Sequence, residues 1–425
     1  MTPPPVDVTI LGAGAAGLMA ARELLRAGKR VTLLEAGERS GGRVLPLSES
    51  EFGYPAEAGA EYIHGAAPTT RALLEEAGLA VRPLTGRRWT LQEGHWVPRD
   101  TAPHQEQFMA AMEALTADEP VGRFLQRHFS APEHEALRQL IVREVEGYNN
   151  AELGRFSAFA LREQWRDPDS ERQERVVGGY GALIDFLANE VRARGGALHL
   201  GAEATALAID GERVTVRCRD GRAFAARQAV VTLPLPLLAA LELPAALRAS
   251  MTAANAATGY GAVLKFHLRF KSRWWVEGRP DLDDMGFVFG AKSAVPTWWT
   301  QYPTEHAVLT GWCSASRLAW VPGTSEAQRL DAALGSLAEI FGRPAPALKT
   351  DLVAWRATHW GEERFAGGAY SYPTVGTHAA LAALRQAATG PVLLAGEALY
   401  ADGETGTVEA ALASGKHAAG MALKA

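Results

Sequence analysis

The segment from residue 6 to residue 35 constrains the fold of this chain more than any other feature. Residues 6–11 are rich in β-branched side chains, as in a buried strand, and residues 18–27 have the composition of a helix. Gly28 is placed to end that helix, and residues 30–35 have the pattern of a second strand. The segment therefore predicts one βαβ unit of roughly 30 residues, the building block of a parallel sheet.

The turn between the first strand and the helix has the pattern GxGxxG. Gly12 allows a tight turn, Gly14 lets the backbone approach a pyrophosphate, and Gly17 permits close packing of the helix on the strand. The N-terminus of the helix that follows the turn offers unpaired N–H groups and a partial positive charge to phosphates. Glu35, at the end of the second strand, can accept hydrogen bonds from ribose hydroxyls. The unit predicts dinucleotide binding but does not distinguish NAD from FAD.

The composition excludes several other classes of protein. With 425 residues, of which 47% are apolar, the chain is long enough for two domains with large buried interiors. Its net charge of −5 argues against nucleic-acid binding, which normally requires a basic surface. The sequence contains no HxxxH or CxxC pairing, so we expect no metal site.

Cysteine usage and hydropathy indicate the compartment. The two cysteines, Cys218 and Cys313, lie far apart in the sequence and are expected to be reduced, as in a cytosolic protein. The segment Met1–Pro5 is a short proline-rich lead without the apolar core of a signal peptide. No stretch approaches the ~18 consecutive apolar residues of a membrane-spanning helix. We therefore expect a cytoplasmic protein with no membrane or nucleic-acid partner.

Downstream of the βαβ unit, helical and strand-like patterns alternate without an internal repeat. Helical spacing of apolar residues occurs in 69–78, 118–165, 182–194, 325–341 and 405–419. Strand-like runs occur in 199–209, 213–219, 222–226, 229–232, 263–270, 287–289 and 392–395, with hairpin turns at Asp210–Gly211 and Asp220–Gly221. The runs at 263–270 and 287–289 are expected in a different sheet from the runs before them. This order predicts two domains that are interleaved along the chain.

Four further blocks occur in order and carry a family resemblance. They are Arg39–Arg43 (RSGGR), Glu57–Gly65 (EAGAEYIHG), Gly259–Phe266 (GYGAVLKF), and Leu394–Glu397 (LAGE) followed by Gly403–Ala410. With these blocks the chain resembles, over nearly its whole length, the flavin amine oxidase family, which includes monoamine oxidases and polyamine oxidases. The resemblance implies that the dinucleotide is FAD, because a dehydrogenase that uses only NAD would not need the distant C-terminal block.

The resemblance also implies where the cofactor binds. The implied positions are Gly12, Gly14, Ala15, Gly17, Glu35, Gly42, Arg43, Gly59, Ala60, Glu61, Ala204, Gly396, Glu397, Gly406, Thr407 and Val408. Arg43 is expected near the pyrophosphate or the isoalloxazine. Glu397 and the helix after it are expected to meet the ribityl phosphate and the pyrimidine edge, where reduced flavin carries negative charge. Ala369 stands where monoamine oxidases carry the flavin-linking cysteine, so we expect the FAD to be non-covalent.

The implied fold is α/β: a Rossmann-like FAD-binding domain interleaved with an α+β substrate domain that contains a mixed sheet and helices. Residues 1–76, 177–254 and 363–425 are expected to form the FAD-binding domain. Residues 77–176 and 255–362 are expected to form the substrate-binding domain. The main chain would then pass between the two domains four times.

In the family that the chain resembles, a neutral amine loses hydride from its α-carbon to flavin N5. The imine hydrolyses to an aldehyde or ketone, and O2 reoxidises the flavin to give hydrogen peroxide. Lys265 is our first candidate for catalysis, because the resemblance implies that it holds a water against N5 and assists reoxidation. From the pattern alone, Lys265 would be a lysine on an exposed strand face, opposite its apolar neighbours Leu264 and Phe266.

Aromatic residues are expected around the amine, because an aromatic face binds cationic amines. Tyr370 corresponds to one wall of the aromatic cage of monoamine oxidases, and the alternative is a structural turn tyrosine. The second wall would align with Thr407, which departs from the usual aromatic. Trp360, Trp298 and Trp299 could replace it, although each is better explained as packing.

Three ionisable residues complete the candidate site. His64 matches a histidine that some polyamine oxidases use near the amine, and its titration range suits control of amine protonation. Glu61 could attract a second cationic nitrogen. Glu146 lies near a region that lines the pocket in the family, but a solvated helix face is the better default.

The expected function is therefore an FAD-dependent amine oxidase, with a polyamine, diamine or monoamine as substrate and O2 as acceptor. The alternatives are an L-amino-acid oxidase or an FAD-dependent desaturase of the same superfamily, such as a protoporphyrinogen or carotenoid enzyme. An amino-acid oxidase would need an arginine that clamps the substrate carboxylate. A flavin-binding protein without turnover is a third possibility, which the joint occurrence of Lys265, His64 and Tyr370 disfavours.

Overall fold

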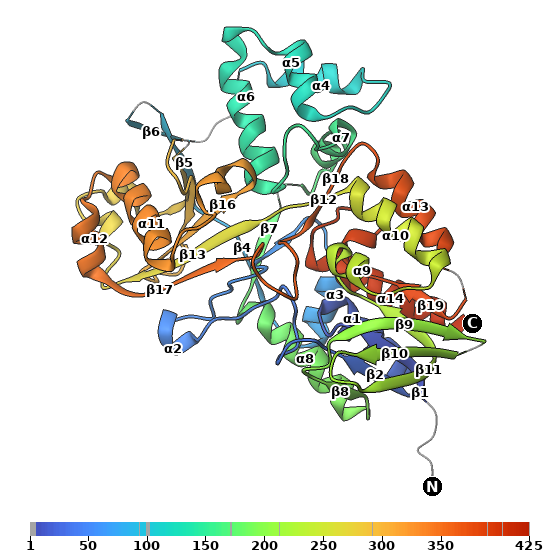
Figure 1. Cartoon of the computed structure of the whole chain (residues 1–425). Coiled ribbons are helices and arrows are strands. Elements are labelled where there is room, and N and C mark those ends of the chain that lie inside the picture. The colour runs from blue at the N-terminus through green and yellow to red at the C-terminus, as the bar shows by residue number, and fades with distance from the viewer. Residues whose placement is uncertain are drawn as a thin grey trace.

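The computed structural model describes residues 6–92, 94–98, 103–170, 172–211, 213–290, 292–388, 390–401 and 403–424 (Figure 1). The lead Met1–Pro5 lies outside these residues. Among the described helices, none combines the length and the apolar character needed to cross a membrane. Two large sheets, with a cluster of helices beyond the second, make up the described structure.

The first sheet is built around the predicted βαβ unit. Its path runs β8 (Ala197–His199), β2 (Val31–Leu34), β1 (Val6–Leu11), β11 (Ala223–Val231), β10 (Arg213–Cys218) and β9 (Ala204–Asp210), and β19 (Val392–Leu394) pairs with β11. Strand β1 is parallel to both β2 and β11, whereas β9, β10 and β11 form the predicted antiparallel meander. The carboxyl ends of the parallel strands therefore meet at one edge, which is where nucleotides bind in sheets of this type.

The structure corrects two predictions about this sheet. The run 199–209 was expected as one strand, but residues 200–203 are not in a strand and separate β8 from β9. The runs 222–226 and 229–232 were expected as two strands, but they form the single strand β11. Residues 223–226 of β11 pair with β10, and residues 226–231 pair with β1. One continuous strand thus joins the meander to the parallel part of the sheet, and no turn separates the two runs.

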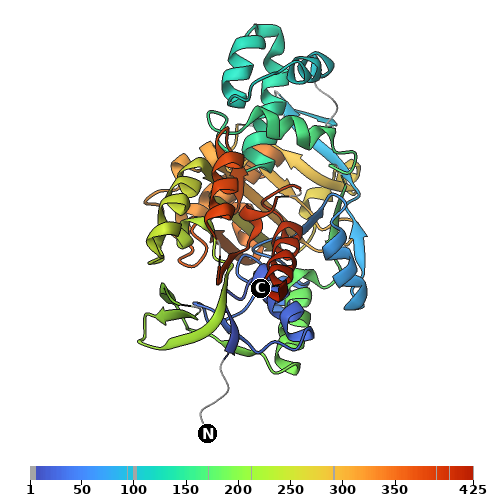
Figure 2. The same ribbon diagram turned by 90° about the vertical axis from the view of Figure 1, so that its right-hand side faces the viewer.

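Helices cover both faces of the first sheet. On one face, α1 (Ala15–Arg26), α3 (Pro68–Glu76), α8 (Gly179–Ala193) and α14 (Val408–Lys424) enclose a core with β1 and β2. On the other face lie α9 (Leu235–Ala240), α10 (Ala245–Ala257) and α13 (Thr377–Ala387). Helix α14 packs so closely on α1 that a Cβ at Gly415 would lie 2.2 Å from the carbonyl oxygen of Ala16. Figure 2 shows this C-terminal helix beside the N-terminal elements.

The second sheet has the order β17 (Leu352–His359), β13 (Val263–Phe270), β16 (Val308–Ser314), β15 (Thr297–Trp299), β14 (Met285–Phe289), β5 (Arg87–Gln92) and β6 (His95–Pro98). It is mixed, because β14 and β5 are parallel and the other neighbours are antiparallel. Helices α11 (Glu326–Phe341) and α12 (Ala345–Asp351) and several tryptophans fill the core on one face. The predicted strands 263–270 and 287–289 both lie here, in a different sheet from the meander.

The helices beyond the second sheet lie at the top of Figure 1. They are α4 (Gln105–Glu113), α5 (Val121–His128), a 3₁₀ turn (Pro132–His134), α6 (Glu135–Val142), a π-helix (Arg143–Tyr148) and α7 (Ala158–Arg166). The predicted helical stretch 118–165 is therefore several short helices, and Pro120 and Pro132 stand where two of the pieces begin. The π-helix is a rare element that often marks a functional site.

Short elements connect these parts. They are α2 (Glu49–Phe52), the sheet β3 (Tyr62–His64)–β7 (Gln173–Val176)–β4 (Val81–Pro83), and the pair β12 (Thr258–Tyr260)–β18 (Ser371–Pro373). The helix predicted at 405–419 begins only at Val408, because Gly406 has a left-handed φ of +78° and Thr407 caps the helix. The N–H of Ala410 donates to Thr407 Oγ1 at 3.0 Å. This arrangement places the start of α14 beside strand β18.

Candidate active site

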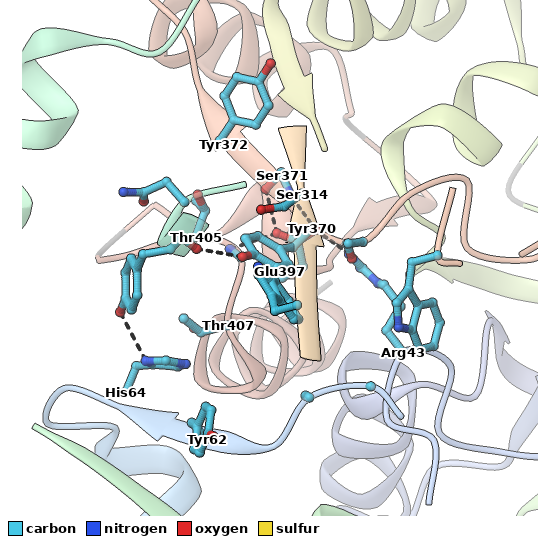
Figure 3. Close-up of a pocket in the computed structure, with 18 of the residues that line it drawn as sticks. Arg43, Tyr62, His64, Ser314, Tyr370, Ser371, Tyr372, Glu397, Thr405 and Thr407 are labelled. Atoms are coloured by element: carbon cyan, nitrogen blue, oxygen red, sulfur yellow. Dashed lines mark hydrogen bonds and ion pairs between the residues drawn. The ribbon is translucent and has the colours of Figure 1, made fainter. Parts of the chain in front are cut away.

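One cavity of about 3440 Å³ runs from the first sheet to the second sheet and the π-helix. At one end its wall contains the glycine-rich turn and Glu35, and at the other it contains Lys265, Tyr370 and His64. Figure 3 shows the region in which Arg43, His64, Tyr370 and Glu397 come together from different elements. The cavity therefore brings the predicted cofactor residues and the predicted catalytic residues into one continuous space.

The glycine-rich turn has the geometry that the pattern predicted. Gly12 has a φ of +100°, and a Cβ there would lie 2.7 Å from Thr232 Oγ1. A Cβ at Gly17 would lie 1.9 Å from the carbonyl oxygen of Gly12, so α1 packs directly against the turn. Gly14 and Ala15 line the cavity, and no side chain among the described residues caps the N-terminus of α1. That helix end is free to receive a phosphate.

Glu35 is oriented over this turn by two backbone groups. Its Oε2 accepts from the N–H of Ala13 and its Oε1 from the N–H of Gly37, both at 2.8 Å. Glu35 lines the cavity, and each carboxylate oxygen has a further lone pair for a ribose hydroxyl.

Arg43 and Glu397 join the first and the last of the four predicted blocks. Arg43 Nη1 donates to Glu397 Oε1 and to the carbonyl oxygen of Ala369, both at 2.8 Å. The Arg43 guanidinium also lies 5.6 Å from the centre of the Tyr260 ring, close enough for a cation–π contact. Arg43 is thereby fixed beside the segment that carries Ala369 and Tyr370.

Glu397 is buried and accepts several further hydrogen bonds. Its Oε2 accepts from Ser371 Oγ at 2.6 Å and from the N–H of Gly406 at 2.9 Å, and its Oε1 accepts from Tyr260 at 3.2 Å. Burial alone would raise the pKa of Glu397, but Arg43 and these donors hold it below its usual range. Glu397 is therefore a charged anchor that fixes the start of α14 against β18.

The residues present fit FAD. Except for Gly17, every position expected to contact the cofactor lines the large cavity. At the end of the cavity near the glycine-rich turn, the N-terminus of α1 has no side-chain cap and there is room above Gly14. The exception is a correction: Gly17 lies behind the turn, where its lack of a side chain allows helix packing, and does not face the cavity. Gly42 and Ala204 line the same cavity between its two ends.

Lys265 lies on β13 and is 1% exposed. Its Nζ donates to Glu61 Oε2 at 2.8 Å and to the carbonyl oxygens of Glu57 and Gly59 at 2.7 and 3.2 Å. The exposed strand face that the pattern alone would give Lys265 is therefore excluded. Lys265 lines the large cavity and holds the segment Glu57–Gly59 against the second sheet.

The Glu61 carboxylate accepts more hydrogen bonds from the protein than a carboxylate that binds substrate would. Its Oε1 accepts from Arg175 Nε, Trp299 Nε1 and Gln301 Nε2 at 3.1 to 3.2 Å, in addition to the bond from Lys265 to Oε2. Burial alone would raise its pKa, but the charges of Lys265 and Arg175 hold the pKa of Glu61 well below the usual range. Two protein cations already balance its charge, which argues against the expected attraction of a substrate ammonium.

His64 and Tyr370 are connected through Tyr148, the last residue of the π-helix. The Tyr148 hydroxyl lies 3.0 Å from His64 Nδ1, and the Tyr370 hydroxyl donates to the backbone oxygen of Tyr148 at 2.6 Å (Figure 3). Burial lowers the pKa of His64 to about 4, so the ring is neutral at neutral pH. His64, Tyr148 and Tyr370 all line the large cavity.

Trp312 is an aromatic residue that the sequence reasoning missed. It lies directly opposite Lys265 on the neighbouring strand β16, so both side chains leave the same face of the sheet. Its ring is stacked on Tyr370, with centroids 6.5 Å apart and an interplanar angle of 26°. Only the strand register brings these residues together, and nothing local to Trp312 in the sequence indicates it.

The three tryptophans considered from sequence have other partners. Trp298 is fully buried in the core of the second sheet, where Nε1 donates to the carbonyl oxygen of Val295 at 3.0 Å. Trp360 donates to the carbonyl oxygen of Ala58 at 3.0 Å and lines the cavity. Trp299 donates to Glu61 and also lines the cavity. None of the three stacks on Tyr370 in the described structure.

Glu146 departs from its expected solvated position. It is 9% exposed, and its Oε2 accepts from Ser316 Oγ at 2.6 Å. The carbonyl oxygen of Glu146 accepts from Ser314 Oγ at 2.5 Å. The π-helix is thus attached to strand β16 and the turn after it, which explains the burial and corrects the prediction.

Acidic residues line the part of the cavity next to Tyr148. Glu404, Glu144 and Asp167 all contribute to its wall. Burial, together with the negative charges of Glu144 and Asp167, raises the pKa of Glu404 to about 7. The sequence reasoning missed this group, because the three residues lie far apart in the chain. This part of the cavity wall therefore carries three acidic side chains.

Comparisons with known proteins agree with this geometry. The model of a family described as flavin containing amine oxidoreductase matches residues 15–423. Polyamine oxidase 4 of Oryza sativa subsp. japonica is 25% identical, over 98% of this chain and 88% of its own length. Putrescine oxidase of Kocuria rosea is 25% identical, over 99% of this chain and 95% of its own.

A solved structure of wild-type putrescine oxidase bound to putrescine has a similar fold. It superposes with a TM-score of 0.81 at 21% sequence identity, covering 99% of this chain and 100% of that one. This likeness confirms the predicted fold class, a Rossmann-like cofactor domain interleaved with an α+β substrate domain.

Proposed function

The chain belongs to the family of flavin-containing amine oxidoreductases, and on that premise we propose that it oxidises a diamine or polyamine with FAD held non-covalently in the large cavity. When bound, FAD supplies the acceptor at N5 for the hydride of the amine α-carbon and passes the electrons to O2, giving H2O2, while water converts the imine to an aldehyde. The protein must orient the amine, keep it neutral and control the charge around the flavin.

Tyr370 and Trp312 form the aromatic wall against which the amine binds. Their rings are stacked and half-buried. The bond from the Tyr370 hydroxyl to Tyr148 fixes one ring, and the bond from Trp312 Nε1 to the carbonyl oxygen of Gly147 at 2.9 Å fixes the other. An aromatic face attracts the cationic form of an amine and also packs against its alkyl chain. Trp312 thus supplies part of the aromatic surface that Thr407 does not.

His64 favours the neutral, reactive form of the amine. Because its pKa is about 4, it is uncharged at neutral pH and does not repel an arriving ammonium. The neutral ring can accept a hydrogen bond from the amine N–H, while Tyr148 holds its Nδ1. Lys265 is proposed to act on the flavin side of the site, and Glu61 keeps it in place.

The acidic end of the cavity favours substrates with a second positive charge. Glu404 and Glu144 lie near Tyr148, Asp167 lies near Glu404, and all three line the cavity. An amine bound at Tyr370 that carried a second ammonium would place it against these carboxylates. A second ammonium could pair with Glu404 or Asp167, which a monoamine cannot do, so a diamine or polyamine fits better.

Two further expectations remain part of the proposal. The alanine at position 369 offers no thiol for a covalent bond to the flavin, which supports non-covalent FAD. Cys218 and Cys313 are buried and form no disulfide, which supports the proposal that the protein functions in a reducing, cytoplasmic compartment. The division into an FAD-binding domain (1–76, 177–254, 363–425) and a substrate-binding domain (77–176, 255–362) is supported by the two sheets, which draw their strands from these two sets.

The single observation that carries the proposal is that one cavity holds both the nucleotide turn and Lys265, His64 and Tyr370. The test is anaerobic mixing of the FAD-loaded protein with putrescine, spermidine, benzylamine and an L-amino acid, followed by flavin absorbance. We expect the diamine and polyamine to bleach the flavin fastest, with peroxide released when air is admitted. Bleaching by the amino acid alone would favour an amino-acid oxidase, and no bleaching by any amine would refute the proposal.

A further inference from the structure

A second, smaller cavity of about 180 Å³ adjoins the Lys265–Glu61 pair, because Glu61 is part of its wall, whereas Trp312 and Tyr370 are not. Its outer part is formed by Arg82, Val177 and Gly178, which are exposed. Its inner part is formed by Glu57 and Glu61. Glu61 lines both cavities, so its side chain is part of the wall that separates them.

The inner end of the small cavity contains a buried carboxyl group with unused bonding capacity. Glu57 is 4% exposed, and its Oε1 accepts from the N–H of Gly181 at 2.8 Å, at the start of helix α8. Its Oε2 is buried and has no hydrogen-bond partner among the described residues. Glu57 lines this cavity, which exceeds the ~10–15 Å³ that one water needs, so a water can lie beside its side chain. If Glu57 only capped helix α8, this would explain the hydrogen bond to Oε1 but not why the buried Oε2 has no partner.

Glu57 is also connected to the catalytic lysine. Its backbone oxygen accepts from Lys265 Nζ at 2.7 Å, and Glu61 Oε2 accepts from the same nitrogen at 2.8 Å. Lys265 itself lines the large cavity. One layer of side chains, Glu61 and Lys265, therefore separates the solvent-accessible small cavity from the space assigned to the flavin.

The proposed reaction requires a proton at this place. To form H2O2, O2 receives the equivalent of one hydride, which the amine gave up, and one additional proton, so that two O–H bonds form. The substrate cavity would be a poor source of this proton while an amine product occupies it.

We propose that the small cavity is a proton path from solvent to Lys265, and that the Glu57 carboxyl is the group in it that takes up and releases the proton. The inference rests on the proposed function, because it assumes that O2 is reduced next to Lys265. In each turnover Glu57 gives one proton, passed by water beyond Glu61 and Lys265, to the oxygen that is being reduced to H2O2, and it regains one proton from solvent through the small cavity. Glu57 is thus a proton donor for reoxidation and has no part in amine oxidation.

Among the ionisable groups next to Lys265, Glu57 is the one suited to release and take up a proton near neutral pH. Burial, reinforced by Glu61 and opposed by the Gly181 N–H and Lys265, raises the pKa of Glu57 to about 7. Glu61 and Arg175 keep their charges at neutral pH, because each stabilises the other. Burial lowers the pKa of His267, on the same strand as Lys265, to about 3, so it stays neutral.

The remaining ionisable groups in or beside the small cavity do not titrate near pH 7 in contact with Lys265. The pKa of Tyr54 is raised by burial beyond the physiological range, and the pKa of His306, which stacks on Tyr54, is lowered by burial. Arg82 at the mouth is exposed. Tyr180, beside Glu57 in α8, also has a pKa raised by burial. None of these groups changes charge close to pH 7 in contact with Lys265.

The test is Glu57→Gln, which keeps an oxygen to accept from Gly181 but cannot titrate. In stopped-flow experiments, anaerobic flavin bleaching by putrescine should be unchanged. Reoxidation by O2 in the wild type should slow as pH rises through about 7, and in Glu57→Gln it should be slower by about tenfold or more and lack that transition. Infrared titration of the apo and FAD-loaded protein should show a carboxyl group that ionises near pH 7 in the wild type and is missing in the variant.

Two controls separate the possible outcomes. Asp118→Asn changes another carboxylate that accepts from a backbone N–H at a helix start (Phe159, 3.1 Å), and it should leave reoxidation unchanged. Val177→Trp narrows the mouth of the small cavity and should slow reoxidation, whereas Val353→Trp, at another exposed valine, should not. Normal bleaching with wild-type reoxidation in both Glu57→Gln and Val177→Trp would overturn the proton path. Failure of the wild type to bleach would refute the proposed function instead.

Discussion

The buried pair of Lys265 and Glu61 allows a prediction about stability that depends on which partner is removed. In Glu61→Gln, Lys265 and Arg175 lose their shared counter-charge and remain close to each other in a buried site. In Lys265→Met, Glu61 keeps the ion pair with Arg175 and the bonds from Trp299 and Gln301. The loss of the carboxylate should therefore destabilise the protein more than the loss of the lysine.

The sizes of the two effects follow from the groups left behind. Removing one partner and leaving an unpaired buried charge costs about 3–5 kcal/mol, which applies to Glu61→Gln. Losing hydrogen bonds to a charged group while its other partners remain costs about 1.5–3 kcal/mol, which applies to Lys265→Met. For 425 residues that unfold together, an unfolding entropy of roughly 2.1 cal/mol/K per residue makes 1 kcal/mol equal to about 1 °C in Tm. We therefore expect Tm to fall by about 3–6 °C in Glu61→Gln and by about 2–3 °C in Lys265→Met.

The assay is thermal unfolding at saturating FAD, repeated on the apo-protein so that a change in cofactor affinity is separated from a change in the fold. The double variant should lose less than the sum of the single variants, because it removes both charges of the pair. As a control, Arg30→Gln breaks the exposed Arg30–Asp7 pair and should cost at most about 1 °C. A larger loss in Lys265→Met than in Glu61→Gln would refute the reasoning.

Three further predictions concern the cavity. Tyr370→Ala should raise KM for putrescine by roughly two- to thirtyfold, the range expected for the loss of about 0.5–2 kcal/mol of cation–π attraction, and an unchanged KM would remove Tyr370 from the amine site. Because the pKa of Glu404 is raised to about 7, the group is neutral below and ionised above that pH, so KM for a diamine should fall as pH rises through about 7. Glu404→Gln should abolish this fall and raise KM for diamines roughly two- to fivefold at pH 8 without affecting benzylamine, and an equal effect on both amines would contradict the assignment. Precipitation of the protein with acid should release all the FAD into the supernatant, as measured by flavin fluorescence, since residue 369 is alanine, and flavin retained in the pellet would contradict non-covalent binding.

The sequence determined the parts of this protein that depend on local backbone geometry. The turn at Gly12–Gly17 needs a positive φ at Gly12 and no side chain at Gly17, and both requirements are visible as glycines. The strand, turn, helix and strand that surround it have short-range patterns, so the nucleotide end could be predicted in detail. The family resemblance added the positions of Lys265, His64 and Tyr370, all of which line the large cavity.

Only the tertiary structure decided how the side chains of the site are paired. Trp312 reaches Tyr370 because β16 pairs with β13 in one particular register, and a strand register is set by contacts along the whole sheet. Glu61 is neutralised by Lys265 and Arg175, which are 204 and 114 residues away in the chain. No local pattern could distinguish this bound carboxylate from one that is free to bind a substrate.

The same limit explains Glu57 and Glu404. A glutamate has the same appearance in sequence whether it lies in water or in a closed cavity, yet burial and nearby charges bring the pKa of both groups to about 7. Residue type and spacing therefore determined the dinucleotide site, and the family resemblance added FAD and the class of chemistry. Burial and the long-range placement of charges, which arise only when the two sheets and the π-helix pack together, decided which carboxylates are anchors and which can titrate.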